Sequence, residues 1–298
     1  MSWEPHTLTT VEVVDPSPVA ALSALLDSGR STPVAGDPLP PLWHWVALPR
    51  WSPSSVLDAD GHPRRGDFLP PLDLPRRMFA GGEVKVLGEL RVASTVVRRT
   101  TVTSVQQKNG RTGPLGLVEV TTHLIDPASD DVLVEERQDI LYREAAPRSE
   151  QESRPDPGEA ARATPAGPPL VPADDGWRFV TDPTLLMRFS AATANAHRIH
   201  YDWPYTTRVE GYRGLVVHGP LSTLALAEAA RSVSGDCRVV KLSHRNIAPV
   251  ICGDDTRIVF SPREADHAEV VLQRPDGTRL SHLTLHLDAP TPKGTTHG

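Results

Sequence analysis

A stretch rich in proline, glycine, alanine and charged residues divides the chain into two parts of similar length. It runs from Ala145 to Ala173 and contains almost no large apolar side chain. Because such a composition cannot build a packed core, it is typical of a surface linker. It predicts a linker over 146–173 between an N-terminal domain, 1–145, and a C-terminal domain, 174–298. The 298 residues are sufficient for two domains of ordinary size.

The two parts repeat the same order of secondary structure. Each has an apolar helical candidate followed by segments rich in Val, Thr and Leu that alternate like strands. The helical candidates are 39–48 and 220–232, with a further one at 18–27, and the strand candidates are 84–92, 95–105, 115–125 and 132–142, then 239–246, 256–261, 268–274 and 278–287. Asn109-Gly110 and Asp276-Gly277 predict tight hairpin turns, since these residue types tolerate positive φ. The repeated order predicts an α+β fold built twice.

Composition and charge indicate a globular protein that acts on small molecules. The formal charge is −6 and basic residues form no long run, which argues against binding to nucleic acid. Only Cys237 and Cys252 are present, too few for a disulfide framework, so a reduced cytoplasmic setting is expected. No segment approaches the run of about 18 apolar residues that a membrane span requires. We therefore expect no contact with a membrane.

The segment Phe189–Asp202, FSAATANAHRIHYD, gathers polar residues at the end of a predicted helix. Asp182 followed by Pro183 fits a helix N-cap and first turn. The helix should break near Asn195, because the polar groups that follow would be costly to bury without partners. The segment is typical either of a capped, solvated turn or of a turn that presents a histidine to a reacting group.

A second motif, Gly214–Leu221 with sequence GLVVHGPL, leads into the helix predicted from Pro220. Gly219 would let the backbone approach a ligand closely. The free N–H groups and the positive end of the helix dipole could stabilise an enolate oxygen formed from an acyl thioester. Taken alone, the motif also fits an ordinary tight turn into a core helix.

Together the two motifs resemble those of MaoC-type hotdog enzymes, whose pattern is approximately S-G-D-x-N-P-I-H followed by G-L-x-x-H-G-M. The resemblance is closest to the branch of two-hotdog 3-hydroxyacyl-thioester dehydratases that contains mesaconyl- and itaconyl-CoA hydratases. The N-terminal part resembles the FAS1-type dehydratase half through DPLPPLWHW, GHPRRGDFLPP and PRRMFAGG. The resemblance implies a double hotdog, two antiparallel sheets each wrapped around a central helix and packed as an intrachain pseudo-dimer. It also implies that the N-terminal half is non-catalytic and widens the acyl tunnel.

The resemblance places the catalytic histidine at His200 and the partner of that histidine at Asn195. The general family has Asp at the second position, and Asn can orient water but cannot accept a proton. Proton transfer would then fall to His200, as base and as acid. The implied reaction is the reversible hydration of an enoyl thioester, with an (R)-3-hydroxyacyl thioester as the hydrated form. An acyl-CoA thioesterase and a non-catalytic acyl-CoA-binding module remain alternatives.

These arguments give a set of candidate site residues. The predicted catalytic residues are His200, Asn195 and Gly219, and the predicted substrate-binding residues are His197, Arg198, Tyr201, Asp202, Val217, His218, Arg76, Arg77, Gly81, Gly82 and Arg245. Arg76 or Arg77 would be available to a substrate carboxylate or to the phosphates of coenzyme A, and the alternative is that both are exposed basic residues at the edge of a loop. His44 lies between two tryptophans and is expected to be a packed core histidine.

The substrate carrier would be coenzyme A or acyl carrier protein, and no cofactor is expected. The histidines near His200 could bind zinc, but the sequence has no HExxH motif and no cysteine ligand among them, so no metal is expected either. The sequence leaves open the acyl chain and whether two chains associate as a homodimer.

Overall fold

The structure, a computed structural model, describes residues 3–110, 113–144, 167–233, 238–261 and 267–288. Its helices are α1 (Pro16–Leu26), α2 (His44–Ala47), α4 (Pro183–Ala192), α5 (Trp203–Arg208) and α6 (Gly219–Val233), with short 3-10 turns η1 (Ser54–Val56) and η2 (Arg198–His200). Its strands are β1 (Thr7–Val13), β2 (Arg76–Val86), β3 (Thr95–Gly110), β4 (Gly113–Ile125), β5 (Val132–Arg143), β6 (Leu170–Ala173), β7 (Gly176–Phe179), β8 (Arg238–Asn246), β9 (Arg257–Phe260), β10 (His267–Gln273) and β11 (Arg279–Asp288).

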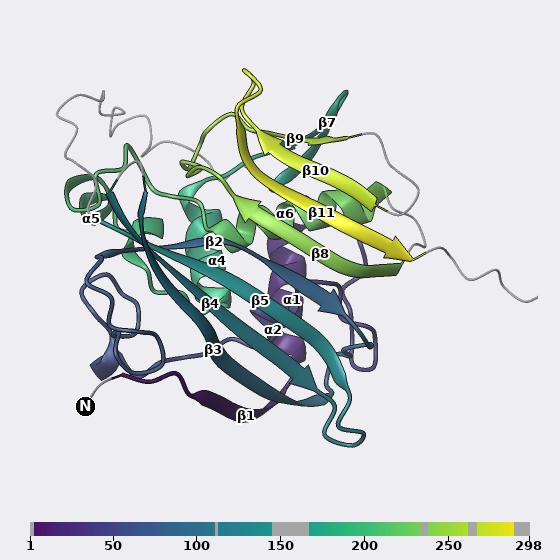
Figure 1. Ribbon diagram of the computed structural model, residues 1–298. Coiled ribbons are helices and arrows are strands. Elements are labelled where there is room, and N and C mark those ends of the chain that lie inside the picture. Colours follow the sequence, from purple (N-terminus) through teal and green to yellow (C-terminus); the bar gives the residue numbers. More distant parts are fainter. Residues whose placement is uncertain (1–2, 111–112, 145–166, 234–237, 262–266, 289–298) are drawn as a thin grey trace, which may run out of the picture.

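The strands form one continuous sheet across both halves of the chain (Figure 1). Their order is β1-β3-β4-β5-β2-β8-β11-β10-β9-β7-β6, and all neighbouring strands run antiparallel. The N-terminal half ends at β2, which pairs with β8 of the C-terminal half. The predicted α+β double hotdog is confirmed, with the sheets of the two halves joined edge to edge.

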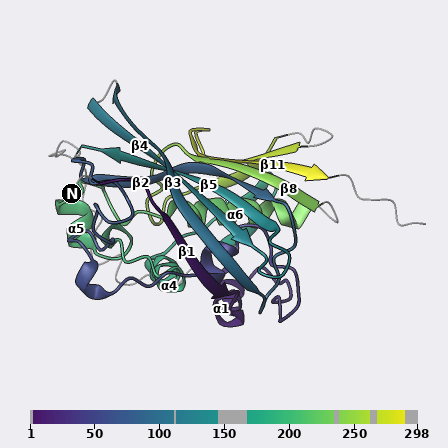
Figure 2. The ribbon, with the colours of Figure 1, turned by 60° about the horizontal axis from the view of Figure 1, so that its bottom comes forward.

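The longer helices lie against one side of this sheet (Figure 2). In the C-terminal half, every residue of α6 from Leu221 to Ala230 is buried, and α6 contacts β2, β10 and β11. It is the central helix of that half, which confirms the helix predicted at 220–232. The helix predicted at 18–27 corresponds to α1. No helix among the described residues has both the length and the apolar character needed to cross a membrane.

The N-terminal half does not contain the helix predicted at 39–48. Only α2, four residues long, is helical there. Pro40 and Pro41 supply no N–H groups and force the residues before them out of the helical region. Leu42 has a φ of 70°, and Pro49 follows directly after the segment. The prediction was wrong because the apolar pattern was read without the effect of these prolines.

Two further predictions need correction. Strand β3 continues through Asn109 and Gly110, which pair with Pro114 and Gly113, so Asn109-Gly110 belongs to the strand and does not form the predicted turn; residues 111–112 lie outside the described residues. The predicted C-terminal end of the linker, at Ala173, is wrong, because Leu170–Ala173 forms β6 and pairs with β7. Residues 145–166 lie outside the described residues. The turn at Asp276-Gly277 is confirmed, with Gly277 at a φ of 84°.

The seam between the halves requires glycine. Gly81 lies opposite Arg245 and Gly82 lies opposite His244 in the β2–β8 pairing. A Cβ atom on Gly82 would lie 2.1 Å from the backbone oxygen of Arg137, on the other neighbouring strand. Since both neighbours are held by ladder hydrogen bonds, neither backbone can move away.

We therefore expect Gly82→Ala to lower the free energy of unfolding by about 1–3 kcal/mol through overpacking. Gly88→Ala is the matched control, since its Cβ would meet first the end of the Leu133 side chain, at 2.7 Å, which can rotate away. Urea unfolding of both variants tests this. Equal stability of the parent and the Gly82 variant would contradict the argument.

Candidate active site

The turn that carries the histidines begins where α4 ends. Asp182 caps this helix by accepting a hydrogen bond from the Leu185 amide at 2.8 Å, and the helix stops at Ala192. Ala194 then adopts a φ of 54°, and the Asn195 side-chain oxygen accepts a hydrogen bond from the His197 amide at 3.0 Å. The predicted helix start at Asp182 and the break near Asn195 are confirmed.

His200 is held with one ring nitrogen fixed to the backbone. Its side chain is 6% exposed, and Nδ1 lies 2.7 Å from the carbonyl oxygen of Val216. Because a carbonyl can only accept, Nδ1 carries the proton and Nε2 is left as an acceptor. Burial lowers the pKa of His200 to about 3, although the bond to Val216 acts in the opposite direction. The ring is therefore neutral at pH 7, with Nε2 available to take a proton.

A second histidine, His218, packs against one face of the His200 ring. His218 is 1% exposed and stacks on His200, with the ring centroids 3.5 Å apart and the planes 18° from parallel. Its Nε2 atom is 2.8 Å from the hydroxyl of Ser190 on α4. Burial, followed by repulsion from His200 and His197, lowers the pKa of His218 well below its usual value. The stack fixes the plane of His200.

The N-terminus of α6 lies at the same site. Gly219 is the first residue of the helix, so its N–H group has no acceptor within the helix. A Cβ atom at this position would lie 3.0 Å from Asn246 Nδ2 and 3.1 Å from the ring of Phe79. Glycine therefore keeps the helix end accessible between these two side chains.

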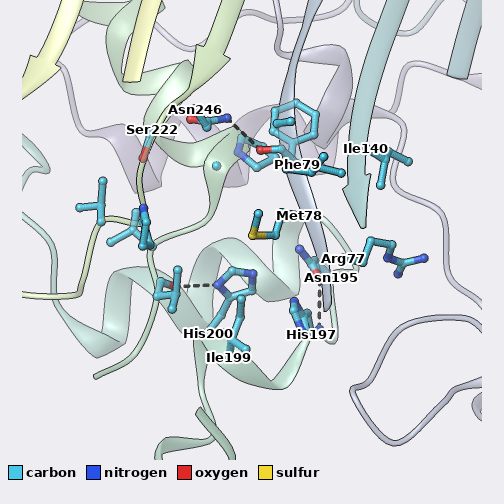
Figure 3. Close-up of a pocket in the computed structure, with 18 of the residues that line it drawn as sticks. Arg77, Met78, Phe79, Ile140, Asn195, His197, Ile199, His200, Ser222 and Asn246 are labelled. Atoms are coloured by element: carbon cyan, nitrogen blue, oxygen red, sulfur yellow. Dashed lines mark hydrogen bonds between the residues drawn. The ribbon is translucent and has the colours of Figure 1, made fainter. Parts of the chain in front are cut away.

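These groups surround a cavity of about 510 Å³ (Figure 3). Residues from both halves of the chain line it, including His62, Arg77, Met78, Phe79, Ile140, Asn195, His197, Ile199, His200, Tyr212, Val217, Gly219, Ser222 and Asn246. In Figure 3, Met78 of β2 lies across the cavity from His200. The cavity thus combines apolar walls with few polar groups, which is usual for a small-molecule site.

A second cavity of about 400 Å³ extends from the first into the N-terminal half. The two share the lining residues Leu69, Phe79, Gln138, Ile140, Asn195 and Pro220. His44 lies in its wall, 6% exposed and 3.0 Å from Glu136, so the prediction of a packed histidine is confirmed. Burial would raise the pKa of Glu136, but hydrogen bonds from His44, Trp45 and Gln138 hold it below its usual value.

The structure brings some of the predicted site residues together at the first cavity and places others elsewhere. Those that line it are His200, Asn195, Gly219, His197, Val217 and Arg77. Those outside its lining are His218, Arg198, Tyr201, Asp202, Arg76, Gly81, Gly82 and Arg245. His218 is the exception in this second group because it contacts His200 directly.

The residues outside the lining have other neighbours. Arg198 pairs with Asp202 at 2.7 Å, and Asp202 also caps α5. Tyr201 is 47% exposed, with its hydroxyl bonded to the Ala196 carbonyl. Arg76 is 3.3 Å from Glu210. The remaining three, Gly81, Gly82 and Arg245, lie in the seam described above.

Sequence reasoning missed the loop that contains His62. His62 lines the cavity and its Nδ1 lies 3.0 Å from the Asp60 carboxylate. The segment GHPRRGDFLPP carries part of the resemblance to the dehydratase half, but its local sequence does not indicate a role for its histidine. Asp60, His62 and His197 have potential ligand atoms within 4.8 Å of one another. The hydrogen bond between Asp60 and His62 occupies Nδ1 of the His62 ring, which leaves Nε2 as its other potential ligand atom.

Comparison with known sequences adds independent information. The sequence pattern of a family described as hydroxyacyl-thioester dehydratase type 2 matches residues 42–252. The chain is 39% identical over 289 residues to mesaconyl-C(4)-CoA hydratase of Chloroflexus aurantiacus, covering 96% of this chain and 97% of that protein.

Solved structures agree on the fold. A MaoC-like dehydratase from Phytophthora capsici superposes with a TM-score of 0.66 at 13% identity, covering 97% of each chain. A Mycobacterium tuberculosis protein described as a double hotdog superposes with a TM-score of 0.51 at 17% identity, again covering 97% of each chain.

The buried histidines predict a stability that falls in acid. In the unfolded chain the pKa of a histidine is about 6.5. Burial lowers the pKa values of His200, His197 and His218 in the folded protein. Below pH about 6.5 the unfolded state therefore binds more protons, and each such histidine removes about 1.4 kcal/mol of stability between pH 7.5 and 5.5. Urea unfolding across this range should show the decline, and His200→Gln should make it smaller. A constant free energy of unfolding would contradict this assignment.

Proposed function

The chain belongs to the hydroxyacyl-thioester dehydratase type 2 family, and we propose that the cavity beside His200 is where it carries out the chemistry. The protein is a hydro-lyase of acyl thioesters: it interconverts an α,β-enoyl thioester and a 3-hydroxyacyl thioester by adding or removing water. The proposal rests above all on the bond between His200 Nδ1 and the Val216 carbonyl, because this bond leaves Nε2 as an acceptor inside the cavity.

In hydration, His200 Nε2 removes a proton from a water molecule, and the water oxygen bonds to the β-carbon. The electron pair of the double bond moves to the thioester oxygen, giving an enolate. The N–H group of Gly219 donates to this oxygen, and the dipole of α6 adds a favourable potential. Asn195 holds the water through its amide. The proton taken from the water then returns to the α-carbon, which leaves His200 neutral again, and the proposed product is the (R)-3-hydroxyacyl thioester.

The second cavity is the proposed space for the acyl group that extends into the N-terminal half. The N-terminal half lacks a long central helix at this place, having only the four residues of α2. This is the proposed division of the chain: a non-catalytic N-terminal half that enlarges the acyl site, and a catalytic C-terminal half. Coenzyme A or acyl carrier protein would carry the acyl group, and His197 and Val217 would contact it.

The relative from Chloroflexus suggests mesaconyl-C(4)-CoA as the first substrate to test. A mesaconyl group carries a carboxylate on its double bond, and such a group needs a cation close to the reacting carbons. Arg77 lines the cavity together with Asn195 and His200, and among the described residues no ion pair involves it. We propose that Arg77 binds this carboxylate. A cytoplasmic setting and a homodimer belong to the same proposal.

Replacing His200 tests the proposed chemistry. His200→Ala should lower kcat for hydration of crotonyl-CoA or mesaconyl-C(4)-CoA by about 10²- to 10⁴-fold, since the general base is lost. The loss of enoyl absorbance measures the reaction. His123→Gln, in β4 and outside the cavity, is the control and should retain parental activity. A folded His200→Ala protein with parental activity contradicts the proposal, and release of free thiol by the parent would instead indicate a thioesterase.

Replacing Arg77 tests the proposed substrate class. Arg77→Gln should raise KM for mesaconyl-C(4)-CoA by about 10-fold or more, as expected for the loss of a charge-assisted contact of about 1.5–3 kcal/mol. Crotonyl-CoA, which has no acyl carboxylate, is the internal control and should be unaffected. An equal rise with both substrates would instead place coenzyme A phosphates at Arg77.

A further inference from the structure

A loop of the N-terminal half is fixed onto the catalytic turn of the C-terminal half. The carbonyl oxygens of Asp60 and Ala59 accept hydrogen bonds from the Arg198 backbone at 2.9 Å and from its side chain at 3.0 Å. Gly61 has a φ of 91°, and a Cβ atom there would lie 1.9 Å from the carbonyl oxygen of Ala196. Only glycine permits this approach, so the loop is closely packed against the turn.

The loop delivers a carboxylate and a histidine to the cavity. One oxygen of Asp60 lies 3.0 Å from His62 Nδ1, and the other accepts a hydrogen bond from the His62 amide at 2.8 Å. Burial would raise the pKa of Asp60, but the hydrogen bonds from the His62 ring and from the His62 amide hold it well below its usual range. The ionised carboxylate keeps the ring proton on Nδ1, so Nε2 of His62 is an acceptor. This is the same tautomer as that of His200.

His197 lies between the two histidines. Its ring centroid is 4.1 Å from that of His62 and 5.6 Å from that of His200, and all three side chains line the cavity. Burial lowers the pKa of each of the three rings, so all three histidines are neutral at pH 7. Asp60, which contacts His62, adds a negative charge that can offset one transferred proton.

We propose that His62, held by Asp60, is a second catalytic residue and exchanges the proton of the α-carbon. This inference rests on the proposed function. In dehydration, Nε2 of His62 takes the α-proton and the C–H electron pair forms the enolate. The proton passes through His197 to Nε2 of His200. The bond between the β-carbon and oxygen then breaks, the enolate electrons form the double bond, and the leaving oxygen takes that proton and departs as water. Hydration is the reverse, and every histidine begins and ends neutral.

The Asp60–His62 pair supplies two things that Asn195 does not: a group that exchanges a proton, and a negative charge near the histidines. Asn195 cannot exchange a proton, and the described contacts of His200 include no carboxylate to stabilise its protonated ring. Asp60 brings that charge from the other half of the chain. A carboxylate on the far nitrogen of a histidine is a common way to orient the ring and to stabilise its imidazolium form.

The test measures dehydration of a 3-hydroxyacyl-CoA that is protonated or deuterated at the α-carbon. His62→Gln should lower kcat by about 10²- to 10⁴-fold with little change in KM. Because removal of the α-proton becomes slower, the primary isotope effect on kcat should increase. Asp60→Asn should shift both values in the same direction, less strongly. Asp58→Asn is the matched control, since among the described residues its carboxylate accepts a hydrogen bond from the adjacent Ala59 amide and from no other group.

Parent enzyme and His200→Ala are measured in parallel, so that the two proposals can fail separately. An inactive parent overturns the proposed function. An active parent, an inactive His200→Ala and a His62→Gln with parental kcat overturn only the role of His62. A reduced kcat with an unchanged isotope effect also overturns it, since the loss then lies outside the α-proton step. Stoichiometric metal in the parent that is absent from His62→Gln would show a cation site instead.

Discussion

The site depends on one hydrogen bond between a side chain and the backbone, from His200 Nδ1 to the Val216 carbonyl. It sets the tautomer of the ring and the direction in which the free nitrogen points. The carbonyl is itself well held, because the amide of Val216 donates to the Ile199 carbonyl at 2.9 Å and Val216 forms a bridge with Ile251. Because His218 stacks against the ring, both the position and the plane of the His200 imidazole are set by the fold.

The two halves share one sheet but differ in the helix that each places against it. The C-terminal half keeps a long, fully buried helix, whose N-terminus supplies an amide to the cavity. The N-terminal half has a four-residue helix at the corresponding place, and a cavity opens there instead. The glycines of β2 let its backbone approach both β5 and β8 closely, and one sheet therefore serves both halves.

The sequence predicted much of this architecture, because strands and the central helix follow local patterns. Strands β8 to β11, helix α6 and the break near Asn195 follow from periodicity and capping, whereas β6 and β7 were not predicted. Two other features depart from what these local patterns predict. Proline overrode an apolar pattern at 39–48, and strand pairing carried β3 past a strong turn signal. Among the site residues, His62 was missed because its position beside His197 depends on packing between segments more than 130 residues apart, which no local pattern reports.

The contact between Gly61 and the Ala196 carbonyl has a consequence for the history of such chains. A substitution that moves the carbonyl, or one that gives the glycine a side chain, would separate the loop from the turn. Neither half can then vary freely at this point without a matching change in the other. If a lineage divided this chain into two separately encoded subunits, their interface would still need a residue without a side chain facing that carbonyl. A pair of subunits built in this way would be recognisable by that glycine.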